Sequence, residues 1–298
     1  MGEFARHDTG DRVETGDRVW ITDVGPRDGL QNESTPVSTA AKIALIDALA
    51  AAGLSEVEAT AFVRSSLVPQ LADAADVMTG ITRRTGTVYS VLVPNERGLD
   101  RAMETSPDKV AIFTAASETF AQRNTNASID ETLVRFAPVF DRCAAAGVPV
   151  RAYVSTAVAC PYVGPIAPSV VADLVERLLA LGPCEIDLGD TIGAARPDDI
   201  DALLDAVADI VPLHEVVLHL HDTGGRALGC AERAIERGVR RFDAACGGVG
   251  GCPFAPGAPG NLSTSSLVRH CRSIGLETGI DADAVDAAAD AIRALLKA

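Results

Sequence analysis

The chain has 298 residues, 47% of them hydrophobic, which is enough apolar material for the core of one large α/β domain or two smaller ones. Its formal net charge of −15 at pH 7 argues against nucleic acid or an anionic membrane as a partner, because both attract basic surfaces. Seven cysteines with no Cys-x-x-Cys pair indicate neither a disulfide framework nor a zinc ribbon, so we expect a reducing, cytoplasmic setting.

The first segment of the chain, residues 1–17, is polar and carries both signs of charge. The stretch TGDRV occurs at 9–13 and again at 15–19, where it runs past the end of this segment. The segment lacks the apolar core of a secretory signal, and no later apolar run approaches the roughly 20 residues of a membrane span. We therefore expect a flexible tail over 1–17 and one domain over 18–298.

From residue 18 onward, eight short apolar runs alternate with Ala- and Leu-rich stretches of helical periodicity. Two of these stretches, 38–53 and 167–182, end in a Gly suited to a helix C-terminus. Apolar strands separated by helices indicate a parallel sheet covered on both faces, and eight such units predict a (β/α)8 TIM barrel with a short C-terminal helical extension. The predicted strands are 19–24, 56–63, 87–93, 109–115, 150–158, 184–190, 215–221 and 241–246.

A doubly wound open sheet is the alternative fold. A dinucleotide-binding sheet of that kind carries Gly-x-Gly-x-x-Gly after its first strand, whereas this chain reads GPRDGLQNE at 25–33. The barrel therefore fits better, and in a barrel the chemistry belongs at the C-terminal ends of the strands. Polar candidates lie in, end or follow the predicted strands: Arg27, Asp28, Glu58, Asp190, His219, His221 and, after a long loop, Asn261.

The stretch LHLHDTGG at 218–225 places His219 and His221 two positions apart on a predicted strand, so both side chains point to the same face. With the Asp28 carboxylate and the Asn261 oxygen they form a mixed nitrogen and oxygen set. Such a set favours Mg²⁺ or Mn²⁺, with Co²⁺, Fe²⁺ and Zn²⁺ able to compete. The alternatives are one core and one surface histidine, or a non-haem iron oxygenase, for which no second feature is present.

The chain has three lysines, Lys42, Lys109 and Lys297, and none lies at the C-terminal end of a predicted strand. A Schiff-base aldolase needs a desolvated lysine in its site, so that class is nearly excluded. If this barrel makes or breaks a carbon–carbon bond, a metal must polarise the oxygens instead.

Residues 247–260 read GGVGGCPFAPGAPG and cannot form a regular helix or strand. A plain surface linker is one interpretation. The other is a lid-like loop over 247–261, because the segment follows the last strand on the functional face. Cys252 lies in its middle, where it could transfer a proton. We expect four other cysteines to be buried: Cys143, Cys184, Cys230 and Cys271.

Five motifs in order resemble the 3-hydroxy-3-methylglutaryl-CoA lyase family, which belongs to the metal-dependent lyase and Claisen-synthase barrels. The resemblance covers about residues 19–290 and is strengthened by FTAASETFAQRNTNASIDETL at 113–133. The motifs are DVGPRDGLQNE (23–33), VEATAFV (57–63), LGDTIG (188–193), HLHDT (219–223) and GGVGGCPFAPGAPGN (247–261).

The resemblance implies divalent-metal-dependent cleavage of a 3-hydroxyacyl-CoA, with hydroxymethylglutaryl-CoA giving acetyl-CoA and acetoacetate. The enzyme would be a homo-oligomer, a dimer or tetramer. Glu58 could instead only brace Arg27, and Asp190 could only cap the following helix. The implied roles are Asp28, His219, His221 and Asn261 as ligands of Mg²⁺ or Mn²⁺, with Co²⁺ or Zn²⁺ possible; Arg27 on the thioester oxygen; Glu58, Asp190 and Gln31 toward substrate; and Cys252 as the proton donor or acceptor.

The chain departs from the family pattern in two places. RSSLVPQ at 64–70 stands where these lyases typically read SPKWVPQ, and Gly224, Gly225 and Arg226 replace Tyr-Gly-Gln. These departures leave the ligands intact but put the acyl group in question, so a lyase for a longer or branched 3-hydroxyacyl-CoA is an alternative. A condensing synthase of the same barrel group and a non-catalytic metal-binding barrel are less favoured alternatives.

Overall fold

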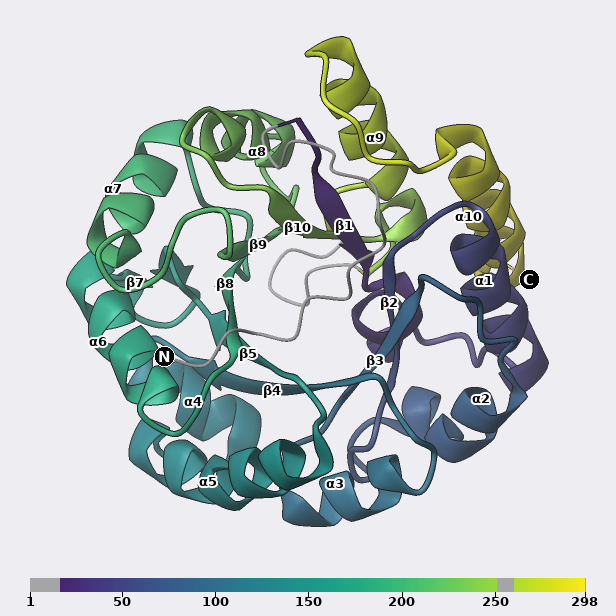
Figure 1. The fold of residues 1–298 in the computed structure, drawn as a ribbon, viewed down its shortest axis with the longest axis horizontal. Helices are drawn as coiled ribbons and strands as arrows, with labels where there is room; N and C mark the ends of the chain where they lie inside the picture. Colours follow the sequence, from purple (N-terminus) through teal and green to yellow (C-terminus); the bar gives the residue numbers. More distant parts are fainter. Residues whose placement is uncertain (1–16, 251–259, 298) are drawn as a thin grey trace.

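The computed structural model describes residues 17–250 and 260–297, which form a closed barrel of eight parallel strands surrounded by helices (Figure 1). The predicted TIM barrel is confirmed, and each predicted strand overlaps one observed strand. Neighbouring strands pair in chain order, and the last pairs with the first. The barrel strands are β1 (Trp20–Asp23), β2 (Glu56–Ala61), β3 (Val88–Leu92), β4 (Lys109–Ala115), β5 (Val150–Ser155), β8 (Glu185–Asp190), β9 (Val217–Leu220) and β10 (Arg241–Ala244).

Helices cover the outer face of the barrel and follow the strands in alternation. Two short strands after β5, β6 (Ala159–Cys160) and β7 (Gly164–Pro165), form a small antiparallel pair that the sequence reading did not include. The α-helices are α1 (Thr39–Ala51), α2 (Ala74–Gly80), α3 (Glu96–Met103), α4 (Glu118–Thr125), α5 (Ile129–Ala146), α6 (Pro168–Leu179), α7 (Pro197–Val207), α8 (Ala227–Glu236), α9 (Thr264–Ser273) and α10 (Ala282–Leu296).

Local sequence signals set the ends of the first helix. The Ser38 hydroxyl accepts a hydrogen bond from the Ala41 amide and so caps the N-terminus of α1. Gly53, just past the C-terminus, has a φ of +96°, and a Cβ there would lie 2.5 Å from the carbonyl oxygen of Gly279. Only glycine fits this position without strain. The helix predicted over 167–182 is also present but ends earlier, at Leu179.

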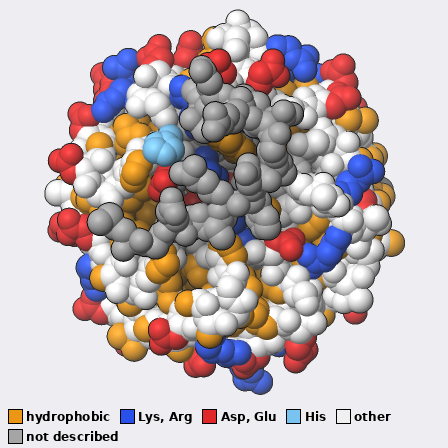
Figure 2. Space-filling model, in the orientation of Figure 1, with side chains coloured by type: hydrophobic (Ala, Val, Ile, Leu, Met, Phe, Trp, Pro, Cys, Tyr) orange, Lys and Arg blue, Asp and Glu red, His pale blue; other side chains and the backbone are white. Residues whose placement is uncertain are grey.

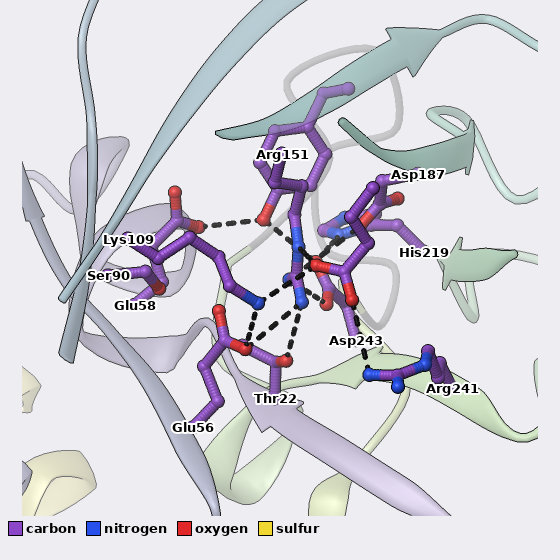
Figure 3. A network of polar contacts seen from close by, with 12 residues as sticks. Thr22, Glu56, Glu58, Ser90, Lys109, Arg151, Asp187, His219, Arg241 and Asp243 are labelled. Atoms are coloured by element: carbon purple, nitrogen blue, oxygen red, sulfur yellow. Dashed lines mark hydrogen bonds and ion pairs between the residues drawn. The ribbon is translucent and has the colours of Figure 1, made fainter. Parts of the chain in front are cut away.

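Charged side chains fill the N-terminal end of the barrel interior (Figure 3). Arg151 lies at the centre of this layer and donates to Glu185 at 2.6 Å, to Asp243 at 2.9 Å and to Glu56 at 3.3 Å. Lys109 donates to Glu56 at 2.6 Å and to Glu185 at 3.0 Å. Buried charges are tolerated only when they are paired in this way. Lys109 is therefore paired with carboxylates at the N-terminal end of the barrel, away from the C-terminal ends of the strands.

The hydrophobic core lies between the outer face of the barrel and the helices. The four cysteines predicted to be buried, Cys143, Cys184, Cys230 and Cys271, are all buried and free. Helix α10 lies beside α1, and the amide of Asp281 donates to the Ala52 carbonyl at 2.8 Å, which ties the C-terminal extension to the barrel (Figure 1). Within the described ranges, no helix has the length and apolar character of a membrane span.

Candidate active site

Arg27 and Asp28 lie in a π-helical turn, Gly25–Gly29, that directly follows β1. The amides of Arg27, Asp28 and Gly29 all donate to the carbonyl oxygen of Val24, at 3.2, 2.7 and 3.1 Å. Short π-helical segments are rare and occur frequently at functional sites. Because three amides share one carbonyl, the turn holds the Arg27 and Asp28 side chains in a defined position at the C-terminal end of the barrel.

The Arg27 guanidinium is buried and donates hydrogen bonds through all three of its nitrogens. Its Nε and Nη2 bond to Oε2 of Glu58 at 2.9 and 2.8 Å, and its Nη1 bonds to Oδ1 of Asp28 at 2.7 Å. Burial raises the pKa of Glu58, and the charge of Arg27 opposes that rise. Glu58 therefore braces Arg27, which is one of the two roles considered for it above.

Asp28, His219 and His221 come together and offer ligand atoms that all lie within 4.8 Å of one another. The two Nε2 atoms are 3.2 Å apart, and Nε2 of His219 is 3.9 Å from Oδ2 of Asp28. Ligands about 2.1 Å from an octahedral cation lie about 3.0 Å apart at right angles and about 4.2 Å apart when opposite. Both separations fall within this range, so the three side chains fit a divalent cation.

The protonation states of these three groups also suit a cation. Burial alone would raise the pKa of Asp28, but the charges of Arg27 and His219 hold it below its usual value. Burial and the neighbouring His219 lower the pKa of His221 to about 4. Nδ1 of His221 is buried and has no hydrogen-bond partner among the described residues. At neutral pH the set therefore offers an anionic carboxylate and a neutral imidazole.

Asn261 and Gln31 hold the Asp28 carboxylate from two further directions. Asn261 donates through Nδ2 to Oδ2 of Asp28 at 2.9 Å and to the Val249 carbonyl at 3.1 Å, and Gln31 donates to Oδ1 of Asp28 at 2.7 Å. The Asn261 backbone also forms a β-bridge with His221. The structure thus brings the four expected ligands together, while their role as ligands stays a prediction.

Gly250 allows the chain to pass this close to the site. Its φ is +101°, and a Cβ there would lie 2.8 Å from Nδ2 of Asn261 and 2.9 Å from Cα of Gly29. A larger residue would be strained in this conformation and would displace the candidate ligand. Cys252 and most of the predicted lid, residues 251–259, lie outside the described residues, as does the tail over 1–16.

Asp190 lies at the end of β8 but is engaged by the loop that follows. Its two carboxylate oxygens accept hydrogen bonds from the amides of Ala194 and Ala195, at 3.0 and 2.9 Å. Helix α7 begins later, at Pro197, so Asp190 stabilises the loop and does not cap the helix. In the described part of the chain, no hydrogen bond or ion pair joins Asp190 to Arg27, Asp28 or the two histidines, and its part in substrate binding stays a prediction.

Sequence reasoning missed two residues that connect the site. Asp243, in β10, accepts from Nδ1 of His219 at 3.2 Å and from the Tyr153 hydroxyl at 2.9 Å, and the same hydroxyl lies 3.0 Å from Oε2 of Glu58 (Figure 3). Burial would lower the pKa of His219, but the bond to Asp243 and the charge of Asp28 raise it. The contact with Asp243 favours the tautomer in which Nε2 of His219 is free to ligate.

Asp23, the last residue of β1, is a third residue that was missed. It accepts from the Gly25 amide at 2.9 Å and from the Thr264 hydroxyl at 2.7 Å. Burial raises its pKa to about 6, although these hydrogen bonds oppose the rise. Its position before the GPRDG turn was the only signal in the sequence.

We expect Asp243→Asn to weaken binding of Mn²⁺ to the free protein by about 10- to 100-fold, the usual effect of losing the carboxylate behind a ligating histidine. Asparagine keeps the size of the side chain but lacks the negative charge that favours Nδ1–H on His219. The measurement is calorimetric titration with MnCl₂. Asp205→Asn, at an exposed aspartate that pairs with Arg237, is the matched control; equal affinity of both variants would contradict this role.

The fold and the site match known proteins along most of the chain. A family model described as HMGL-like matches residues 18–292. The hydroxymethylglutaryl-CoA (HMG-CoA) lyase of Pseudomonas mevalonii is 45% identical over 267 residues, 90% of this chain and 89% of that protein.

Two solved structures show the same likeness. The HMG-CoA lyase of Brucella melitensis superposes with a TM-score of 0.93 at 47% identity, covering 95% of this chain and all of that one. An HMG-CoA lyase from Acinetobacter baumannii in complex with coenzyme A and 3-methylmalate gives a TM-score of 0.90 at 38% identity, covering 95% and 92% of the two chains. Because the family model matches residues 18–292, nearly the whole of this chain, the chain belongs to the HMGL-like family.

Proposed function

We propose that the protein is a divalent-metal-dependent carbon–carbon lyase that cleaves HMG-CoA to acetyl-CoA and acetoacetate. The observation that carries the proposal is the buried Arg27 beside Asp28, His219 and His221, at the C-terminal end of a barrel whose similar proteins are named HMG-CoA lyases. The similar structure that holds coenzyme A supports an acyl-CoA as the substrate.

The reaction is a retro-aldol cleavage, which needs removal of the substrate hydroxyl proton and stabilisation of the charge left on the acetyl fragment. Asp28, His219, His221 and Asn261 would hold Mg²⁺ or Mn²⁺, with Co²⁺ and Zn²⁺ as competitors, and a bound cation would polarise substrate oxygens. Arg27 would donate to the thioester oxygen as it becomes an enolate. Glu58 fixes the guanidinium in place, so the donor is oriented before the substrate arrives.

Cys252 is proposed to transfer the proton that converts the enolate into acetyl-CoA. Cys252→Ser should lower kcat by about 100- to 10,000-fold, the usual scale for a general acid or base. Calorimetry with MnCl₂ should give nearly the same metal affinity as the unmodified protein, because four other groups already form the ligand set. A large loss of metal affinity would instead identify Cys252 as a ligand.

Release of acetyl-CoA from a panel of 3-hydroxyacyl-CoAs, measured with Mg²⁺, tests the function. We expect cleavage of HMG-CoA, with bulkier 3-hydroxy-3-alkylglutaryl-CoAs within about 10- to 200-fold in kcat/KM, because one or two methylenes discriminate only that much. A clear optimum on a longer or branched member would favour that alternative. A synthase would consume acetyl-CoA with a 2-oxo acid, and a binding module would turn over nothing.

Two further expectations stay predictions. The homo-oligomeric state, a dimer or tetramer, is checked by light scattering of the purified protein. The cytoplasmic location is checked by fractionation of the source cells.

A further inference from the structure

A cavity of about 400 Å³ lies between two neighbouring loops at the C-terminal end of the barrel. One wall is the segment that follows β2, Phe62–Ser65, and the other is the segment that follows β3 together with the first turns of α3. Three arginines line it: Arg64, Arg97 and Arg101. No residue of the metal-ligand set or its immediate partners lines this cavity, so it is separate from the site described above.

These three arginines form no ion pair with any carboxylate in the described part of the chain, although the net charge of the protein is −15. Some other arginines are paired: Arg142 binds Asp100 at 2.7 Å, and Arg233 binds Asp201 at 2.8 Å. Figure 2 shows acidic and basic side chains together round the rim of the molecule. The cavity therefore gathers positive charge that the protein itself does not neutralise.

The two walls of the cavity contact each other directly. Arg101 donates to the Val63 carbonyl at 3.4 Å, and its guanidinium lies 5.5 Å from the centre of the Phe62 ring. A Cβ on Gly98 would come within 2.8 Å of the Phe62 carbonyl oxygen, so the two loops touch here with no room for a side chain. Arg101 is thus partly ordered before any ligand binds, which reduces the entropy lost on binding.

We propose that this cavity binds phosphate groups of the coenzyme A part of the substrate. The inference rests on the proposed function, because it is the acyl-CoA substrate that carries phosphates. Guanidinium groups match phosphate oxygens in charge and in paired hydrogen-bond geometry. Arg64 follows Glu58 by six residues, which can span at most about 20 Å. The pantetheine arm separates the thioester from the phosphates by a comparable length.

The family resemblance did not point to this cavity. Arg64 lies in the RSSLVPQ stretch, where the usual family pattern has no arginine. That departure was considered above for its effect on the acyl pocket. The structure places Arg64, Ser65, Ser66 and Leu67 on the exposed surface, so they bear more directly on the distal part of the substrate than on its acyl group.

The test compares HMG-CoA with HMG-pantetheine, which has the same acyl group and thioester but no phosphate. We expect the unmodified protein to favour HMG-CoA in KM, and Arg64→Ala and Arg97→Ala each to reduce that preference by about 10-fold, the equivalent of one charge-assisted hydrogen bond. The variant with both Arg64→Ala and Arg97→Ala should show the smallest preference for HMG-CoA over HMG-pantetheine. Arg272→Ala, an exposed arginine in the last turn of α9, removes the same charge elsewhere and is the matched control.

An equal loss on both thioesters, or no loss on either, would overturn the proposal. Calorimetry separates its failure from that of the proposed function, with CoA, adenosine 3′,5′-bisphosphate and inorganic phosphate as the probes. Arginine-dependent binding of CoA and the bisphosphate without any turnover would retain the cavity and reject the lyase. Turnover of HMG-CoA together with CoA binding that does not depend on these arginines would retain the lyase and reject the cavity as the phosphate site. Binding of inorganic phosphate as strong as that of CoA would overturn the proposal in favour of a free-anion site.

Discussion

Replacing His219 by Ala is expected to lower the rate of HMG-CoA cleavage by at least about 1,000-fold and to remove measurable binding of Mn²⁺. A metal acting as a Lewis acid supplies several kcal/mol to the transition state, and about 4 kcal/mol corresponds to about 1,000-fold in rate. His219 is 7% exposed, lies 3.2 Å from His221 through its Nε2 and is held by Asp243 through its Nδ1. The measurements are acetyl-CoA release and calorimetric titration with MnCl₂.

The same result should follow from removing the metal. Dialysis against EDTA should abolish turnover, and added Mg²⁺ or Mn²⁺ should restore it in the unmodified protein but not in the His219 variant. His214→Ala is the matched control, because the His214 side chain is 66% exposed and lies beside Glu215, away from the candidate ligands. Full activity in excess EDTA after exhaustive dialysis would refute both the metal site and the reaction proposed for it.

Arg27→Lys is expected to lower kcat by about 100- to 1,000-fold, the usual loss when one donor to a developing oxyanion is removed. Lysine keeps the charge beside Asp28 but cannot reproduce the planar fork that reaches Glu58 through Nε and Nη2 and Asp28 through Nη1. The ammonium of the lysine would therefore pair with the Glu58 or Asp28 carboxylate and would lie away from the thioester oxygen. Steady-state kinetics at saturating Mg²⁺ measure the effect.

Binding of Mn²⁺ should change far less in this variant than in the His219 variant, since Arg27 is not a proposed ligand. Arg233→Lys is the matched control, because Arg233 also contacts one carboxylate through two nitrogens but on the outer surface. A kcat within a few fold of the unmodified protein would contradict a direct part for Arg27 in the reaction.

The barrel could be predicted from sequence because its signals are local. Each strand is a short apolar run, and each intervening helix shows three- and four-residue apolar spacing, so the order of elements is visible without any long-range contact. The rule that chemistry collects at the C-terminal ends of barrel strands then brought Arg27, Asp28, His219 and Asn261 to one face. The two-residue period of a strand placed His219 and His221 on the same side.

The connections inside the barrel could not be read in the same way. Tyr153 and Asp243 stand in runs that look like ordinary buried strands, VRAYVSTAV and RFDAAC, with no motif around them. Their partners His219 and Glu58 come from other strands, and which residues meet across the interior depends on the stagger between strands as the barrel closes. Tyr153 in β5 is three strands away from Glu58 in β2, and side chains that far apart in a sheet can meet only after the barrel has closed.

The sequence by itself determined the fold class, the chain order of the strands and the set of polar residues that gather at one end of the barrel, because each depends on local periodicity and on one general rule about barrels. Only the tertiary structure decided that Glu58 braces Arg27, that Asp190 binds its own loop and that Asp243 orients His219. It also decided that Arg64, from the loop after β2, shares one cavity with Arg97 and Arg101 of α3. The physical reason is that a hydrogen bond or an ion pair depends on separations of a few tenths of an ångström. Such separations between distant parts of a chain are set by the packing of the whole barrel.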